Sequence, residues 1–229
     1  MLIFVPLSGA APDGIDLRGA TLRGANLSRG TLGVNPEGPR IVRGFPFRDC
    51  ADLTGADLSG ATLKGAWRGD VRLNGANLRG ADLRGATLVD GELRGADFRG
   101  ADLRGAVLPG SDLRGALLAG ANLDGAQVGH TGLQGVNLEH VTLRRTTLGA
   151  AFLAGADLAN DDLTNADLRH ADLRHASLLH TRLAGANLKD ADLRGANLQG
   201  VTLTGARYDR RTRWPDGFEP QEHGAIKVK

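Results

Sequence analysis

Three histidines, His170, His175 and His180, stand at five-residue intervals and are the side chains most suggestive of metal chemistry. Imidazole nitrogens bind zinc at about 2 Å, so shared ligation requires rings that converge on one ion. Spacing alone does not show convergence. Whether these rings meet depends on the backbone that carries them, so the period of that backbone has to be established first.

Other residue types that perform catalysis lack their usual partners. No Gly-x-Ser-x-Gly, Cys-x-x-Cys, His-Glu-x-x-His or phosphate-binding loop occurs, and the many Gly-Ala steps belong to a repeat. The single cysteine, Cys50, rules out an intramolecular disulfide, and nothing in the sequence marks it as a nucleophile. We therefore predict that the chain is not an enzyme and has no catalytic residue, cofactor or metal.

The composition argues against several classes of partner. The 229 residues include 28 Lys and Arg against 26 Asp and Glu, and a net charge of +2 does not indicate a general nucleic-acid-binding protein. Aromatic residues make up only 4%, so any core must be thin. No run approaches the length of a membrane helix, and the apolar residues 1–7 are too short for a signal peptide. We expect a cytoplasmic protein with no direct contact with nucleic acid or membrane.

A five-residue repeat runs without interruption from residue 51 to residue 210. With the middle residue of each unit as the reference, positions 53 to 208 give 32 pentads, and all but Arg68 carry an apolar residue there, mostly Leu. Ala occupies the position two residues earlier in 22 of them. Five residues advance an α-helix by about 500°, so these apolar positions would spiral around it, which excludes an α-solenoid.

The spacing fits a short extended segment followed by a bend. In an extended chain the reference side chain and the one two residues before it point the same way. Gly two residues after the reference, as at Gly55 and Gly60, allows a tight turn. Repeating this bend produces a coil whose backbone amides pair with the coils above and below, roughly 4.8 Å away.

Units such as Ala81-Asp-Leu-Arg-Gly85 and Ala101-Asp-Leu-Arg-Gly105 resemble those of the pentapeptide-repeat proteins. The resemblance implies an all-β fold, a right-handed quadrilateral parallel β-helix with four pentads per coil and about nine coils. The predicted organisation is an N-terminal cap (1–13), a first pentapeptide coil (14–34), a loop or irregular coil (35–50), a continuous β-helix (51–210) and a C-terminal cap or tail (211–229).

On such a coil, residues five apart lie on successive faces. The rings of His170, His175 and His180 then diverge, and no shared metal is expected. His130 shares a face with His170, and His140 shares one with His180, but each pair stands two coils apart, roughly 9.6 Å. Neither pair can ligate one ion.

Residues 20 apart stack on one face of this coil, and three faces carry columns of Asp and Arg. We interpret these columns as solubility features, since exposed pairs of opposite sign contribute only about 0–1 kcal/mol each. The fourth face has almost no charge in its middle. It is a neutral wall, a wall covered by residues 35–48, or an interaction or dimerisation face. Its candidate contact residues are Trp67, Thr87, Val89, Val107, Pro109, Gln127 and Thr147.

Two pentads depart from the interior pattern. Arg68 falls at an inward position where an unpaired guanidinium is costly, so residues 67–70 are expected to bulge, with a recognition site as the alternative. Asp161 replaces Ala at the other inward position. Its carboxylate is expected to accept hydrogen bonds from exposed turn amides or to bend the strand outward.

Segments outside the repeat offer further contacts. Residues 33–50 contain three Pro and two Phe, and form either an inert excursion or a projecting loop like those of topoisomerase-protecting family members. In the tail, Trp214 and Phe218 surround a Pro-Asp-Gly turn and indicate a cap over an exposed sheet edge, although the nearby arginines offer contacts to phosphate instead. The candidate loop contacts are Arg43, Phe45 and Phe47.

Two functions are compatible with these features. The first is a rigid, non-catalytic rod that mediates protein–protein interaction, with an unidentified protein partner or a second copy in a homodimer. The second, implied by the resemblance, is protection of DNA gyrase or topoisomerase IV from inhibitors by a DNA mimic, which confers antibiotic or self-resistance. Mimicry requires a continuous negative surface, and here only one face leans acidic, interrupted by Arg79 and Arg99.

Overall fold

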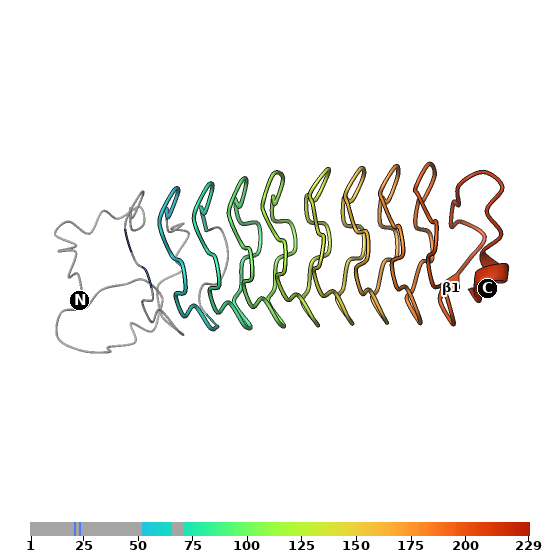
Figure 1. Ribbon diagram of the computed structural model, residues 1–229, viewed down its shortest axis with the longest axis horizontal. Helices are drawn as coiled ribbons and strands as arrows, with labels where there is room; N and C mark the ends of the chain where they lie inside the picture. Colours follow the sequence, from blue (N-terminus) through green and yellow to red (C-terminus); the bar gives the residue numbers. More distant parts are fainter. Residues whose placement is uncertain (1–20, 22, 24–51, 66–70) are drawn as a thin grey trace.

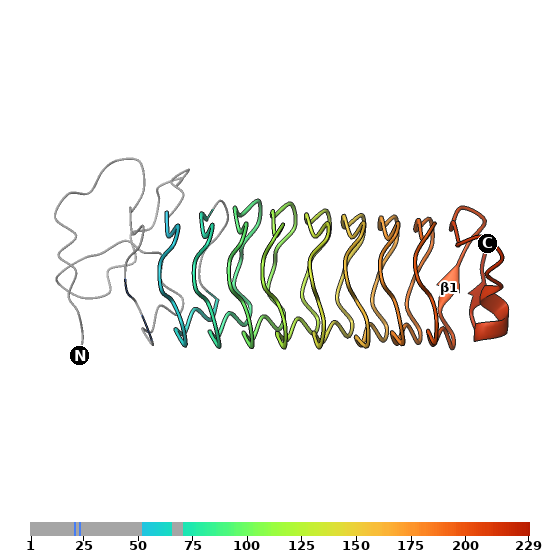
Figure 2. The same cartoon turned by 45° about the horizontal axis from the view of Figure 1, so that its top comes forward.

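The structure, a computed structural model, describes residues 21, 23, 52–65 and 71–229. Its backbone forms a stack of similar turns along one axis, which gives the elongated shape in Figures 1 and 2. The predicted N-terminal cap, the loop 35–50 and the bulge at 67–70 lie outside the described residues. So do the individual candidates Arg43, Phe45, Phe47, Cys50, Trp67 and Arg68.

Parallel β-bridges join residues that are 20 positions apart along the chain. Asp82 pairs with Asp102, and Thr87 pairs with Val107. Four such positions recur within each 20-residue turn, so the predicted stacking of residues 20 apart is confirmed. Thr21, from the first block of repeats, also forms a parallel bridge, with Asp57 of the long block.

Backbone hydrogen bonds connect each turn to the next. The amide of Leu53 donates to the carbonyl of Arg72 at 2.7 Å, and the amide of Asn77 donates to the carbonyl of Ala56 at 2.8 Å. The same two bonds recur at most pentads. The backbone polar groups are therefore satisfied mainly between neighbouring turns rather than within a local helix or hairpin.

Each pentad ends in a tight turn that requires a left-handed residue. The amide of Ala56 donates to the carbonyl of Leu53 at 3.0 Å, and Gly55 between them has a φ of 67°. A positive φ at the third residue is typical of a type II turn, and glycine adopts it without steric cost. The predicted bend and the role of its glycine are confirmed.

The interior is a stack of Leu side chains with Ala beside them. Leu53 and Ala56 are fully buried, as are most of their equivalents, and Phe98 is the largest of these side chains. Where Thr replaces Ala, its hydroxyl is satisfied: Thr181 Oγ1 donates to the carbonyl of Leu158 at 2.7 Å. The narrow axis is filled by buried apolar side chains, and the Thr hydroxyl groups that enter it donate to backbone carbonyls.

The C-terminal segment packs on the last turn. Strand β1 (Arg207–Tyr208) pairs in parallel with β2 (Ile226–Lys227), and the 3-10 helix η1 (Pro220–His223) lies between them in sequence. The ring of Trp214 meets Tyr208 edge-on at 5.5 Å and stacks on Phe218 at 5.4 Å. Both Trp214 and Phe218 pack against the core. No helix in the described part of the chain is long and apolar enough to span a membrane.

Candidate interaction surface

Four uncharged side chains form a straight column on one side of the rod. Bridges join Thr87 to Val107, Val107 to Gln127, and Gln127 to Thr147. Gln127 and Thr147 are exposed, whereas Thr87 and Val107 are partly buried. These residues share a face, as predicted, and their role as contacts with a partner stays a prediction.

The turn positions beside this column are also uncharged. Val89 and Pro109 are partly buried there, and Gly129 and Gly149 continue the same row. A Cβ on Gly129 would stand 3.0 Å from the carbonyl oxygen of Gly149, so backbone atoms themselves form part of the surface. We call the residues Thr87, Val89, Val107, Pro109, Gln127, Gly129, Thr147 and Gly149 the uncharged face.

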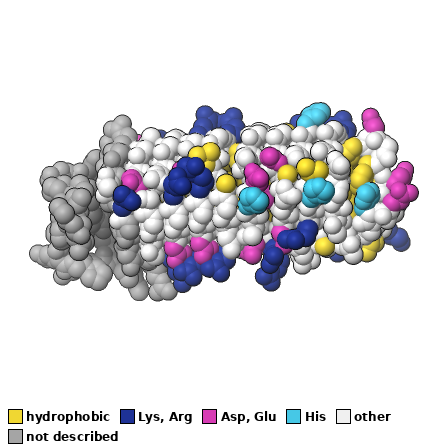
Figure 3. Space-filling view, in the orientation of Figure 1, with side chains coloured by type: hydrophobic (Ala, Val, Ile, Leu, Met, Phe, Trp, Pro, Cys, Tyr) yellow, Lys and Arg dark blue, Asp and Glu magenta, His cyan; other side chains and the backbone are white. Residues whose placement is uncertain are grey.

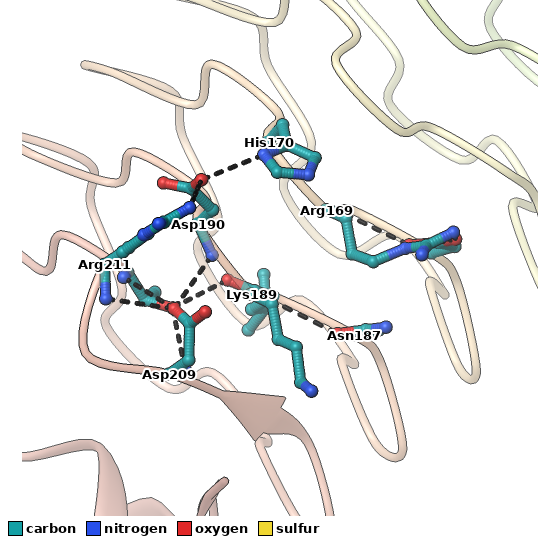
Figure 4. A network of polar contacts seen from close by, with 10 residues as sticks. Arg169, His170, Asn187, Lys189, Asp190, Asp209 and Arg211 are labelled. Carbon is teal, nitrogen blue, oxygen red and sulfur yellow. Dashed lines mark hydrogen bonds and ion pairs between the residues drawn. The ribbon is translucent and has the colours of Figure 1, made fainter. Parts of the chain in front are cut away.

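A network of charged side chains borders the uncharged face toward the C-terminus (Figure 4). His170 Nδ1 lies 3.0 Å from Asp190 Oδ2, and Arg211 Nη1 lies 3.5 Å from the same oxygen. Asp209 Oδ1 accepts hydrogen bonds from the amides of Asp190 and Arg211 at 3.1 and 3.0 Å. These contacts link the tail to the turn beneath it, so a phosphate contact of Arg211, the alternative to a cap, would compete with an existing carboxylate partner.

Asp and Arg two residues apart form ion pairs within many pentads. Arg84 Nε donates to Asp82 Oδ1 at 2.8 Å, and the backbone amide of Arg84 donates to the same oxygen at 3.2 Å. That turn amide has no part in the ladder between turns, so the Asp caps it. From the sequence alone, these Asp residues are interpreted only as solubility features. The signal for the cap was the recurrence of Asp or Asn directly before the interior Leu.

The paired guanidinium groups keep these carboxylates ionised. The hydrogen bond from Arg84 lowers the pKa of Asp82, and that from Arg114 lowers the pKa of Asp112 well below its usual range. The face in Figure 3 accordingly shows basic and acidic side chains close together, with no large area of one sign. Negative charge at the Asp columns is thus largely balanced by the neighbouring Arg.

The histidines stand at the corners of the turns. His170, His175 and His180 have φ values of 61°, 57° and 55°, in the left-handed region that Gly occupies in other pentads. No group of three or more His, Cys, Asp or Glu within the described ranges could hold a metal ion. Left-handed residues other than Gly are most often Asn, Asp or His, which explains the histidine spacing without a metal. Nine corner residues are of these types: Asp90, His130, His140, Asn160, Asn165, His170, His175, His180 and Asp190.

Asp161 is buried in the axis, with 1% of its surface exposed. Its Oδ1 accepts a hydrogen bond from the amide of Val141 at 3.1 Å, which is a buried amide of the neighbouring turn and not one of the exposed turn amides expected. Its Oδ2 has no partner among the described residues. Burial raises the pKa of this carboxyl group to about 8. The side chain is therefore mainly protonated at neutral pH and is unsuited to charge-based recognition.

Three large apolar side chains are exposed, and none was predicted as a contact residue. Leu117, Phe152 and Ile226 are 45%, 46% and 53% exposed. Leu117 and Phe152 occupy the position where half of the pentads carry Asp or Asn, so the signal was an apolar residue at an outward position. Their bridges, Asp97 to Leu117 and Gly132 to Phe152, place them in columns other than the uncharged one.

Comparisons with known proteins agree with the repeat. Residues 49–67, 69–100, 96–135, 142–178 and 180–207 match the family model of pentapeptide repeats, in 8 copies. Among solved structures, HetL from the cyanobacterium Nostoc sp. strain PCC 7120, a pentapeptide repeat protein involved in heterocyst differentiation regulation, aligns with a TM-score of 0.52. The identity is 27%, over 87% of this chain and 89% of HetL.

Two further structures are similar over part or most of the chain. The pentapeptide repeat protein alr5209 from Nostoc PCC 7120 is 38% identical over 47% of this chain and 84% of its own, with a TM-score of 0.28. A trypsin-treated form of QnrB1, a plasmid-mediated fluoroquinolone resistance protein, is 18% identical over 86% of this chain and 92% of its own, with a TM-score of 0.43. No curated protein matches the chain.

Proposed function

The chain belongs to the pentapeptide-repeat family, and we propose that it is a rigid, non-catalytic rod that binds another protein through its uncharged face. The family and its solved structures indicate a right-handed β-helical solenoid as the scaffold. We take this scaffold to be four-sided, with about nine coils and with the tail 211–229 as its C-terminal cap. The role of HetL in regulating differentiation is compatible with a rod that acts through other proteins.

The observation that carries this proposal is the uncharged column held on a hydrogen-bonded ladder. The amide of Leu108 donates to the carbonyl of Gln127 at 2.7 Å, and the amide of Val128 donates to that of Thr147 at 2.7 Å. Backbone that is fixed in this way within each turn loses little conformational entropy when a partner binds. Depletion of charge at its centre is typical of the buried core of protein interfaces.

The DNA-mimicking alternative finds less support in the charge distribution. On the face that leans acidic, Asp97 is held by Arg99 Nη2 and also lies 4.0 Å from Arg79 Nη1. A partner that binds DNA would therefore meet guanidinium groups beside the carboxylates. A supercoiling assay with gyrase and a quinolone tests this alternative directly. Restored supercoiling at micromolar protein would favour mimicry over the uncharged face.

Site-specific photo-crosslinking tests the proposed face. The chain offers a matched pair of exposed glutamines, Gln127 on the uncharged face and Gln134 outside it. We expect a photoreactive residue at position 127, but not at 134, to crosslink one discrete protein in native extract. Mass spectrometry identifies that protein, or a second copy of this chain if the rod dimerises.

A charge placed in the column supplies the second arm of this test. Val107→Glu should abolish the crosslink from position 127 because it buries an unpaired carboxylate at the contact. The control Thr62→Glu adds the same charge in another column and should leave the crosslink intact. Equal crosslinking from positions 127 and 134, or no effect of Val107→Glu, contradicts binding through this face.

A further inference from the structure

The ladder between turns is interrupted on one side of the rod. Leu117 pairs with Asp97, and Asn137 pairs with Asp157, but no bridge joins Leu117 to Asn137. Within the described chain, it is the only gap in that column between residues 57 and 197. Figure 1 shows neighbouring turns standing further apart in the green-to-yellow region than elsewhere.

The backbone groups that should cross this gap have no partners. The amides of Leu118, Gly120 and Asn137 make no hydrogen bond in the part of the chain that the structure describes. At equivalent places the bonds are short: the amide of Phe98 donates to the carbonyl of Leu117 at 2.8 Å. Backbone amides without a protein partner need another one, such as water. We call the interrupted contact between residues 117–120 and 137–140 the seam.

Away from the seam and the adjoining corner at Gly115, whose amide also lacks its bond among the described residues, the same turns stay joined. Half a turn away along the chain, the amide of Gln127 donates to the carbonyl of Ala106 at 2.8 Å, and Val128 donates to Thr147 at 2.7 Å. Those bonds lie under the uncharged face. The same stack of turns is therefore tightly joined at that face and parted at the seam, which is the geometry of a wedge.

Side-chain volume next to the seam favours its opening. The inward positions that flank residues 137–140 are Val136 and Val141, whereas the turn before them carries Ala116 and Ala121 at the equivalent positions. Extra methyl groups in an axis built for Ala force neighbouring backbones apart. Ala116 is 3% exposed, whereas Ala96 and Ala156 of the same row are 0% exposed, so burial is slightly less complete beside the seam.

Asp161 holds the far side of the seam from the next turn. Its Oδ1 receives the amide of Val141 at 3.1 Å, and the amide of His140 also faces this carboxyl group. The amide of His140 makes no bond to the carbonyl of Ala159, its expected ladder partner among the described residues. Asp161 thus stands where the ladder bond of His140 is missing, while the amide of Val141 keeps its turn bond to the carbonyl of Leu138 at 2.9 Å.

We propose that the seam is a hinge of the rod, held open by Asp161, and that movement about it changes the curvature of the uncharged face half a turn away. Hinges of this kind act where packing between two rigid parts is locally weak. The two rigid parts are the ladders before residue 117 and after residue 137. The hinge is a property of the rod itself and does not depend on the presence of a partner.

Amide hydrogen exchange on the full chain, resolved by NMR, tests the hinge. We expect the amides of Leu118 and Gly120 to exchange at least about tenfold faster than those of Leu108 and Val128. Asp161→Ala should slow exchange at Leu118 and Gly120 toward the rate at Leu108. Asp161→Thr serves the same purpose if the Ala variant does not fold, because Thr is accommodated in this row at position 181.

Thr181→Ala is the matched control. It removes a buried polar group from the same row, one turn further on, and should leave exchange at the seam unchanged. Protection of Leu118 and Gly120 equal to that of Val128 in the wild type overturns the hinge, and unchanged seam exchange in both Asp161 variants overturns the role of Asp161. Loss of the crosslink at position 127 leaves these rates unaffected, so the two proposals fail separately.

Discussion

At the scale of single residues, Asp161 should make stability depend on pH. Burial, with the nearby charges of Asp157 and Glu139, raises its folded-state pKa to about 8 from 3.8, although amides of Val141 and His140 oppose this. The folded protein then binds more protons than the unfolded chain between about pH 4 and pH 8. The free energy of unfolding should therefore fall as pH rises through this window, by up to about 1.4 kcal/mol per pH unit.

Urea unfolding of the wild type and of Asp161→Thr at pH 5, 6, 7 and 8 measures this contribution. Burial of the adjacent Asp162 is outweighed by hydrogen bonds from Thr164 and Arg144, which lower its pKa to about 2, so Asp162 stays ionised across this range. Subtracting the two profiles isolates Asp161. A difference that stays constant with pH contradicts a protonated buried carboxyl group.

Two neighbouring residues allow a buried position of the axis to be compared with an exposed position of the surface. Leu113 is 1% exposed, so Leu113→Asp should place an unpaired charge in the dry axis and cost more than about 4 kcal/mol of unfolding free energy. Arg114 is exposed and pairs with Asp112 at the surface, so Arg114→Ala should be nearly silent. Thermal melts followed by circular dichroism compare the two. Similar melting temperatures would contradict the inward assignment of position 113.

At the scale of the pentad, a corner glycine should become costly to replace where a ring lies over it. A Cβ on Gly195 would stand 2.5 Å from His175 Nδ1, whereas one on Gly125 would meet nothing within 4 Å. Both residues are left-handed, so each Ala substitution carries the strain of about 1–2 kcal/mol. We expect Gly195→Ala to destabilise more than Gly125→Ala in chemical unfolding. The excess should vanish in a His175→Gly background, and its persistence there would exclude a clash with the ring.

Much of the pentad was predictable because its period is short and its constraints are local. The interior Leu, the small residue beside it and the glycine corner each follow from one unit, and Leu53, Ala56 and Gly55 confirm them. The seam was not predictable, because Leu117 and Asn137 keep the repeat in phase. It arises from side chains on three successive turns, and a repeat read one unit at a time does not contain that information.

The candidate surface, too, was predictable in part only. Its column was predictable from the 20-residue register, and the bridge from Val107 to Gln127 reproduces it. The caps made by Asp82 and its equivalents were not recognised, because the pattern Asp-Leu-Arg does not reveal that the Arg amide lacks a ladder partner. That role is identified by finding which backbone amides have no partner in the next turn, and not by residue type.

At the scale of the whole molecule, the tail should control end-to-end association. The amide of Ile226 donates to the carbonyl of Ala206 at 2.7 Å, and Arg213 forms a parallel β-bridge with Asp192. Removing residues 211–229 therefore exposes the backbone of the last turn at both places. Uncovered parallel edges template further pairing. We expect the shortened rod to show a mass that rises with concentration in light scattering. The exposed-residue control Ile226→Lys should keep the wild-type mass, and a monodisperse shortened rod would show that the tail has another purpose.

The distribution of corner residues gives the rod a direction. Among the described corners between residues 55 and 125, all are glycine except Asp90, whereas ten corners from His130 to Asp190 bear side chains. One stretch thus has smooth ridges of bare main chain, and the other has ridges studded with imidazoles, amides and carboxylates. A molecule that binds along a row of corners contacts bare main chain at one end and side chains at the other. It can therefore distinguish the N-terminal from the C-terminal direction of an otherwise uniform repeat.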